Sequence, residues 1–175
     1  MIPIYGWRDL SKTLESAAAG TGIPALAAFG LTGTVKQKAF AVGDSVYIGL
    51  QVPHDIRVGS TMYPYVQWTT NGVIANTVKW QMNYTTAKSH DQEVFPADTI
   101  LTLEQAAQGT AWRHMLIEDA VGFSALEPDE FLAIELVRIT NGGVDNADTV
   151  FGLSMGLHYQ VQQFATPNRT PNFYT

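Results

Sequence analysis

The chain has 175 residues, of which 46% are hydrophobic and only 15% are charged. This length fits one domain with a substantial core better than two domains. A globular domain usually has about a quarter of its residues charged, so the deficit predicts that part of the surface faces another protein, with a surface rich in Thr, Asn and Gln as the alternative. The net charge of -6 and the scattered Lys and Arg argue against a nucleic-acid-binding protein, which needs basic patches.

The absence of cysteine predicts a fold without disulfides or thiolate metal sites. The first eight residues lack the basic segment and apolar core of a signal peptide, so we expect assembly inside a cell. No apolar run approaches the roughly 20 residues that a membrane-spanning helix needs. We therefore expect neither a membrane nor a nucleic acid as a partner.

The N-terminal segment, residues 1–33, differs from the rest of the chain. Residues 9–19 are expected to form a short helix, with Asp9 as its N-cap and Gly20 as its stop. The stretch that follows, residues 20–33, is small, apolar and interrupted by Gly and Pro, so it does not form a core of its own. The segment is either an arm that orders on a partner or a strap that packs on its own domain, and the sequence leaves both open.

From residue 34 onward the pattern is typical of β-strands separated by turns. In residues 77–86, for example, Val78, Trp80 and Met82 alternate with polar residues. The expected strands are residues 35–42, 45–52, 61–70, 77–86, 112–118, 131–140 and 150–164.

This arrangement predicts an all-β domain over residues 34–164, an antiparallel, jelly-roll-like β-sandwich or a barrel. A short helix is expected at residues 102–108 within one long connection. Residues 165–175 are expected to form an extended C-terminal tail that ends in two aromatic residues.

The histidines show no motif for metal binding or catalysis. The four of them, His54, His90, His114 and His158, have no ligand spacing along the chain. His158 is expected to be a hydrogen-bonded, half-buried residue in a strand, whereas convergence of the other three in space remains open. Nucleophile elbows and phosphate-binding loops are also absent from the sequence. We therefore expect no catalytic residue, no cofactor and no metal.

Two further patterns bear on whether the protein has a carbohydrate-active function. Carboxylates cluster at Glu118–Asp119 and at residues 127–130, in stretches that look like solvated turns, whereas a glycosidase needs two carboxylates across a cleft. Several aromatic residues would suit either a sugar-binding face or a core: Tyr63, Tyr65, Trp68, Trp80, Tyr84 and Trp112. Their alternation with polar residues favours a core with cross-strand pairs.

Residues 52–68, VPHDIRVGSTMYPYVQW, resemble an "IPHD…PHVHW" signature of a family of uncharacterised tailed-bacteriophage virion proteins. Further stretches agree in order and spacing, so the resemblance covers nearly the whole chain: residues 6–9, 78–84, 95–96, 114–115, 126–129, 156–160 and 170–174. One departure is that Tyr65 and Gln67 stand where the signature has histidines. This departure argues against a metal-binding or pH-sensing role and favours a structural role for this strand.

The resemblance implies a non-enzymatic structural protein of the virion, most specifically a capsid cement or decoration protein assembled in the host cytoplasm. The expected partners are the major capsid protein or other virion proteins, together with further copies of the chain, for which a trimer is the expected state. The alternative is a neck, tail or fibre component that binds a receptor or glycan, and a carbohydrate-active hydrolase is a remote third. The residues expected to contact partners are Trp7, Phe29, Phe173 and Tyr174.

Overall fold

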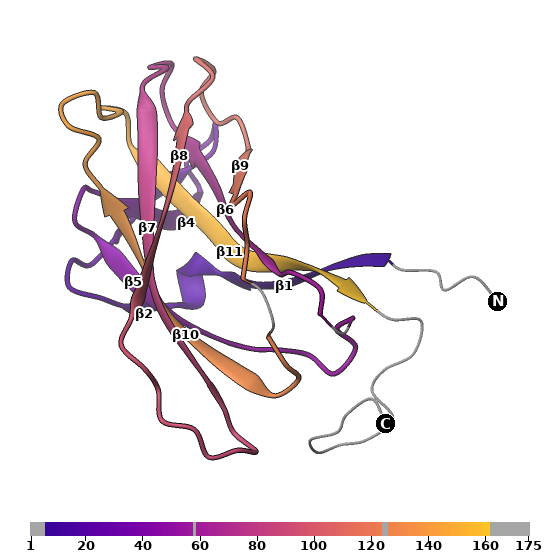
Figure 1. Ribbon diagram of the computed structural model, residues 1–175. Helices are drawn as coiled ribbons and strands as arrows, with labels where there is room; N and C mark the ends of the chain where they lie inside the picture. The colour runs from indigo at the N-terminus through magenta and orange to yellow at the C-terminus, as the bar shows by residue number, and fades with distance from the viewer. Residues whose placement is uncertain (1–5, 58, 124–125, 162–175) are drawn as a thin grey trace.

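Two antiparallel β-sheets pack face to face in the computed structural model, which describes residues 6–57, 59–123 and 126–161 (Figure 1). The six-stranded sheet consists of β1 (Gly6–Thr13), β3 (Ala25–Phe29), β4 (Val35–Phe40), β6 (Tyr63–Thr70), β9 (Met115–Glu118) and β11 (Val150–Val161). The five-stranded sheet consists of β2 (Ala18–Ala19), β5 (Ser45–Gln51), β7 (Thr77–Lys88), β8 (Thr99–Ala106) and β10 (Glu130–Ile139). The predicted β-sandwich is thus confirmed.

Strands that are distant in the sequence lie side by side in both sheets. The order of the six-stranded sheet is β3-β4-β11-β6-β9, with β1 also paired to β11, and the order of the other is β2-β5-β10-β7-β8. β10 therefore lies between β5 and β7, and it pairs antiparallel with each of them. Consequently the ends of β5 and β7 meet the start of β10 at one end of the sandwich.

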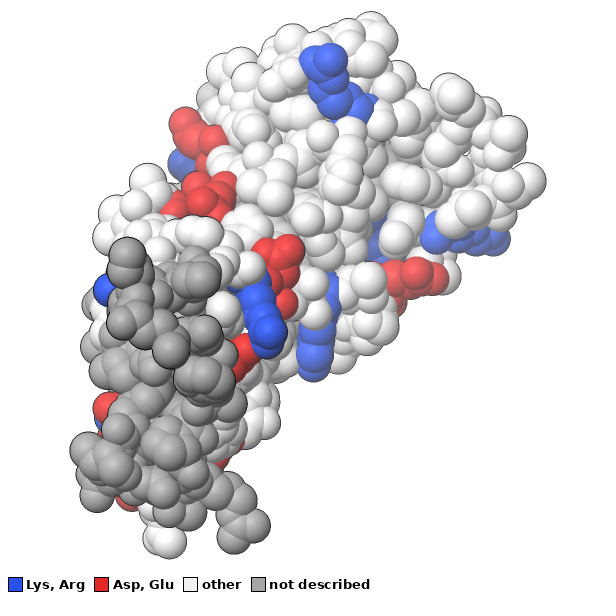
Figure 2. All heavy atoms as spheres, turned by 90° about the vertical axis from the view of Figure 1, so that its right-hand side faces the viewer, with Lys and Arg blue, Asp and Glu red and all other residues white. Residues whose placement is uncertain are grey.

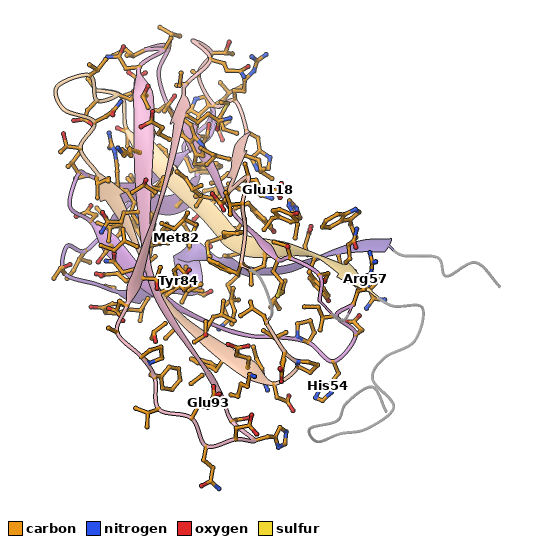
Figure 3. All side chains as sticks on the ribbon, in the orientation of Figure 1. His54, Arg57, Met82, Tyr84, Glu93 and Glu118 are labelled. Carbon is orange, nitrogen blue, oxygen red and sulfur yellow. The ribbon has the colours of Figure 1, made fainter. Side chains whose placement is uncertain are left out.

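The core lies between the sheets and follows the two-residue period of the strands. On β10, Leu132, Ile134 and Leu136 are buried while the residues between them face outward. On β7, Met82 and Tyr84 point into the body of the sandwich (Figure 3). The six-stranded sheet contributes residues such as Val66, Trp68, Met155 and Leu157 from its inner face.

The prediction of a helix at residues 9–19 is wrong. β1 occupies Gly6–Thr13 and pairs with β11 along its whole length, and only a three-residue 3-10 helix, Leu14–Ser16, follows it. The edge that β11 offers outweighs the weak helical preference of this short segment. Residues 6–33 therefore form a strap built into both sheets, which is the second of the two alternatives left open by the sequence (Figure 1).

The prediction of a helix at residues 102–108 is also wrong, because residues 102–106 belong to strand β8 (Thr99–Ala106) and the next two residues are not helical. Leu103 is buried in the core while Thr102 and Glu104 are exposed, which is the alternation of a strand. The tail expected at residues 165–175 lies outside the described residues. Within the described part of the chain, no helix has the length and apolar character needed to cross a membrane.

Candidate functional site

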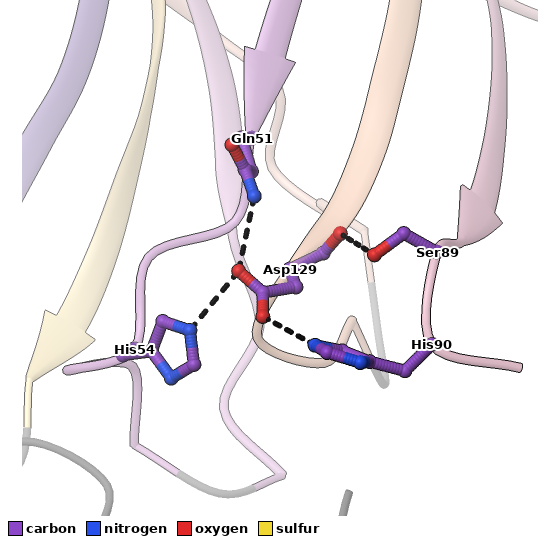
Figure 4. A network of polar contacts seen from close by, with 5 residues as sticks. All are labelled: Gln51, His54, Ser89, His90 and Asp129. Carbon is purple, nitrogen blue, oxygen red and sulfur yellow. Dashed lines mark hydrogen bonds and ion pairs between the residues drawn. The ribbon is translucent and has the colours of Figure 1, made fainter. Parts of the chain in front are cut away.

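Two histidines converge on one carboxylate at the end of the sandwich. His54 Nε2 lies 3.0 Å from Asp129 Oδ1, and His90 Nε2 lies 2.8 Å from Asp129 Oδ2 (Figure 4). Gln51 Nε2 also donates to Asp129 Oδ1, at 3.0 Å, and Ser89 Oγ donates to the backbone oxygen of Asp129, at 3.4 Å. We call these five residues the Asp129 cluster.

The strand order explains why residues so far apart in sequence meet here. His54 follows β5 and His90 follows β7, whereas Asp129 immediately precedes β10, which lies between those two strands. Asp129 adopts a positive φ of 67°, which turns the chain sharply into β10, and its backbone N–H donates to Val52 O at 3.0 Å. The sharp turn aims the carboxylate at both neighbouring loops (Figure 4).

The electrostatics of the cluster favour the ionised carboxylate. Burial is the largest influence and by itself raises the pKa of Asp129. The hydrogen bond from His90 and the charge and hydrogen bond of His54 together outweigh it, so the pKa of Asp129 lies below its usual range. The carboxylate of Asp129, which contacts the imidazoles of His54 and His90, therefore connects three loops.

The chemistry available to the Asp129 cluster is limited by where its polar atoms point. Both Nε2 atoms face Asp129, and the hydroxyl of Ser89 donates to a backbone oxygen. Within residues 6–57, 59–123 and 126–161, no three His, Cys, Asp or Glu side chains are grouped to hold a metal ion. The geometry fits a structural role, in which the Asp129 cluster holds the three loops in place.

Another histidine, His158, lies on the outer face of the six-stranded sheet. His158 Nε2 is 3.0 Å from Asp9 Oδ1, and its Nδ1 bonds the carboxylate of Glu118. The imidazole also stacks on Tyr65, with ring centroids 4.3 Å apart and planes inclined by 25°. The expected half-buried, hydrogen-bonded His158 is therefore confirmed.

A cavity of about 460 Å³ opens beside His158 and is lined by Trp7, Tyr63, Glu118 and His158; we call it the His158 pocket. The rings of Trp7 and Tyr63 lie 5.9 Å apart and form its aromatic side. Trp7, one of the predicted partner-binding residues, is 57% exposed here. Trp7 is thus placed where a partner or ligand can reach it.

The other residues predicted to contact partners are Phe29, Phe173 and Tyr174. Phe29 packs against its own domain, with its ring centroid 5.3 Å from that of Trp112 and 5.4 Å from that of Phe151. Phe173 and Tyr174 lie outside the described residues.

The aromatic residues weighed as a sugar-binding face are mostly inside the protein. Tyr65, Trp68 and Trp80 are fully buried. Tyr84 packs on Phe123 with ring centroids 4.5 Å apart, and only Tyr63 reaches the His158 pocket. The core assignment is therefore confirmed for the three buried residues.

The carboxylate clusters of the sequence are each engaged in local contacts. Asp119 accepts a hydrogen bond from the backbone N–H of Val121, at 3.1 Å, and Glu127 pairs with Lys88 at 2.9 Å. Glu130 is buried and accepts from the backbone N–H of Glu127, at 3.0 Å. Glu118, the other member of the first pair, instead bonds His158 and lines the His158 pocket.

The sequence matches no protein-family model and no curated protein. Among solved structures, the chain is similar to the CBM35 module of Cellvibrio japonicus Abf62, with a TM-score of 0.45 and 12% identity over 85% of this chain and 92% of the module. It is also similar to a protein of the infectious bursal disease virus Gx strain, with a TM-score of 0.46 and 8% identity over 92% of this chain and 33% of that one.

A cycloisomaltooligosaccharide glucanotransferase of Paenibacillus is similar over 83% of this chain, with a TM-score of 0.45 and 14% identity, but this chain spans only 17% of that enzyme. Likenesses this distant assign no activity to the chain.

Proposed function

We propose that this chain is a non-enzymatic structural protein of a virion, most specifically a capsid decoration or cement protein. The observation that carries the proposal is the edge strand β3, which ends the six-stranded sheet and has no further strand beside it in the part of the chain that the structure describes. None of its five residues is charged, whereas the edge strands β8 and β9 carry Glu104 and Glu118. Charges on an edge strand normally prevent it from pairing with another chain.

Apolar side chains surround this open edge. Ile23, Leu26 and Val35 are exposed, and Leu31, in the turn between β3 and β4, is 93% exposed. Exposed apolar residues that are contiguous with an unpaired edge are typical of a surface that binds another protein. A strand of a neighbouring protein added to β3 would satisfy the free backbone groups and cover these side chains.

The distribution of charge supports protein partners over nucleic acid. The face in Figure 2 is mostly uncharged, and its few Lys and Arg residues are interspersed with Asp and Glu. Such a surface suits the major capsid protein, other virion proteins or further copies of the chain. It lacks the basic patch on this face that phosphate binding would need.

The direct test is a quantitative count of this chain in purified particles of the virus that encodes it. A copy number that follows the capsid symmetry supports a cement or decoration protein. A copy number equal to that of a neck, tail or fibre component supports the alternative position instead. Complete absence of the chain from purified particles would contradict a virion role.

A paired set of variants tests the role of β3 itself. Leu26→Glu places a charge on the edge opposite Lys38, where the cross-strand pair is favourable, so the hairpin is expected to remain folded. Ile100→Glu is the matched control, since Ile100 is similarly exposed on the edge strand of the other sheet. We expect Leu26→Glu alone to reduce incorporation into particles, and to reduce the mass of any homo-oligomer measured by light scattering.

A further inference from the structure

Three small residues in adjacent strands form a transverse trench across the outer face of the five-stranded sheet. Ala133 on β10 pairs directly with Gly49 on β5 and with Thr85 on β7, so the three lie in one row. Larger residues, Phe131 and Glu135, flank Ala133 along its own strand and face the same side. The resulting trench has a volume of about 490 Å³.

One wall of the trench is aromatic. A Cβ atom on Gly49 would lie only 2.6 Å from Cζ of Phe131, so glycine at this position allows the Phe131 ring to extend over the neighbouring strand. The Phe131 ring is still 41% exposed, and Phe95 meets it edge-on with centroids 6.4 Å apart. Tyr47, which is 50% exposed, lines the opposite side.

The other wall is polar and held in a fixed orientation. Asn83 Nδ2 donates to Glu135 Oε2 at 3.0 Å, and Gln81 Nε2 donates to Asn83 Oδ1 at 2.7 Å. Ser45 Oγ donates to Glu135 Oε1 at 2.8 Å. The amide of Asn83 has two N–H donors, and each carboxylate oxygen of Glu135 has two acceptor positions. The hydrogen bond between Asn83 and Glu135 therefore leaves one donor of Asn83 and one acceptor position of Glu135 side by side.

We propose that this trench binds a neutral oligosaccharide. The C–H face of a pyranose ring would lie against Phe131, while two vicinal hydroxyls would exchange hydrogen bonds with Asn83 and Glu135 on the opposite side, in the row that also holds Tyr47. The polar lining of the trench favours this ligand class. Glu135 and Asp98 line the trench without any described Lys or Arg, which disfavours anionic ligands. An apolar peptide would leave the remaining donor of Asn83 and the remaining acceptor of Glu135 unused.

The inference does not depend on the virion assignment, because it concerns the face of the five-stranded sheet and not the edge of β3. Its test is a titration of the full chain with cellohexaose, maltohexaose and mannohexaose, followed by NMR shifts and calorimetry. The test variant is Ala133→Gln, whose longer side chain occupies the trench floor. Its matched control is Val137→Gln, on the same strand and the same face but outside the trench lining.

We expect at least one of the three sugars to bind the unmodified chain and to shift the resonances of residues that line the trench. Ala133→Gln should weaken this binding by on the order of tenfold or more, whereas Val137→Gln should leave it unchanged. Failure of all three sugars to bind, or equal binding by both variants, would overturn the proposal. A change in solution mass on Ala133→Gln without any sugar binding would overturn it as well, because the face would then be a contact between copies.

Discussion

Leu14 packs directly against Gly152, so closely that a Cβ atom on this glycine would lie 2.7 Å from Leu14 Cδ1. Leu14 is fully buried and follows immediately after β1, which pairs with the second half of β11. The N-terminal segment therefore supplies a core residue and a strand to its own domain. It is not an arm that can be removed without consequence.

Replacement of Leu14 by alanine is expected to lower the free energy of unfolding by about 2–5 kcal/mol, the range for a leucine deleted from a packed core. The measurement is urea unfolding followed by circular dichroism. Leu31→Ala is the control, and because Leu31 is 93% exposed it should change stability by about 0.5 kcal/mol or less. By the same argument a chain that lacks residues 1–30 should not unfold cooperatively, and a stable, cooperative truncated chain would contradict this account.

Asp129→Asn should destabilise the fold at neutral pH and much less in acid. Asparagine tolerates the positive φ at this position, so the change mainly removes the charge that His54 and His90 contact. The pKa of Asp129 is lowered in the folded state, so its contribution is present above the unfolded pKa of about 4 and is lost as the pH falls through the folded value.

Urea unfolding of both proteins at a series of pH values measures this contribution. The difference in unfolding free energy should be present above about pH 4 and should shrink as the pH falls below it. Asp91→Asn, which changes an exposed carboxylate beside His90, is the control and should show little difference at any pH. A difference for Asp129→Asn that stays constant into the acid range would show that the charge is not what the histidines stabilise.

Long alternating patterns in the sequence predicted their strands well. The strands expected at residues 131–140 and 150–164 correspond to β10 and β11; every second side chain of β10 enters the core, and in β11 the alternation shifts between Gly152 and Ser154. Parts of β1 and β8 lie where helices are expected, at residues 9–19, with Asp9 as N-cap and Gly20 as stop, and at residues 102–108. β1 is a strand because it pairs with β11, and β8 is a strand because it pairs with β7. The local sequence does not indicate either pairing.

The sites depend even more on long-range pairing. Of the three histidines whose convergence remained open, His54 and His90 do meet, on Asp129, whereas His114 bonds Gln67 Oε1 at 3.0 Å. Motif spacing detects ligands on one strand or one turn, and these residues come from three separate loops. The trench is equally hidden, because a row of small residues exists only once the register of three strands is known.

Gln105 links the two sheets, and its replacement by leucine is expected to cost about 1–3 kcal/mol. Its side-chain oxygen accepts a hydrogen bond from Trp68 Nε1 at 3.0 Å, and its amide donates to Leu116 O at 3.1 Å. Leucine would leave the indole N–H of the buried Trp68 without its acceptor. Thr102→Leu, at an exposed position of the same strand, is the control. Equal stability of both variants in urea, with unchanged tryptophan fluorescence, would contradict a structural role for this link.

His158→Gln is expected to leave the fold intact and to cost about 1 kcal/mol or less. His158 contacts two carboxylates, but its side chain is 27% exposed and those of Asp9 and Glu118 are 57% and 37% exposed, so solvent screens both ion pairs. His114→Gln, which removes an exposed histidine bonded to Gln67, serves as the control in the same unfolding experiment. Elemental analysis of both variants completes the test. A loss of several kcal/mol specific to His158→Gln, or a bound metal that disappears with it, would mean that His158 does more than join β1, β9 and β11.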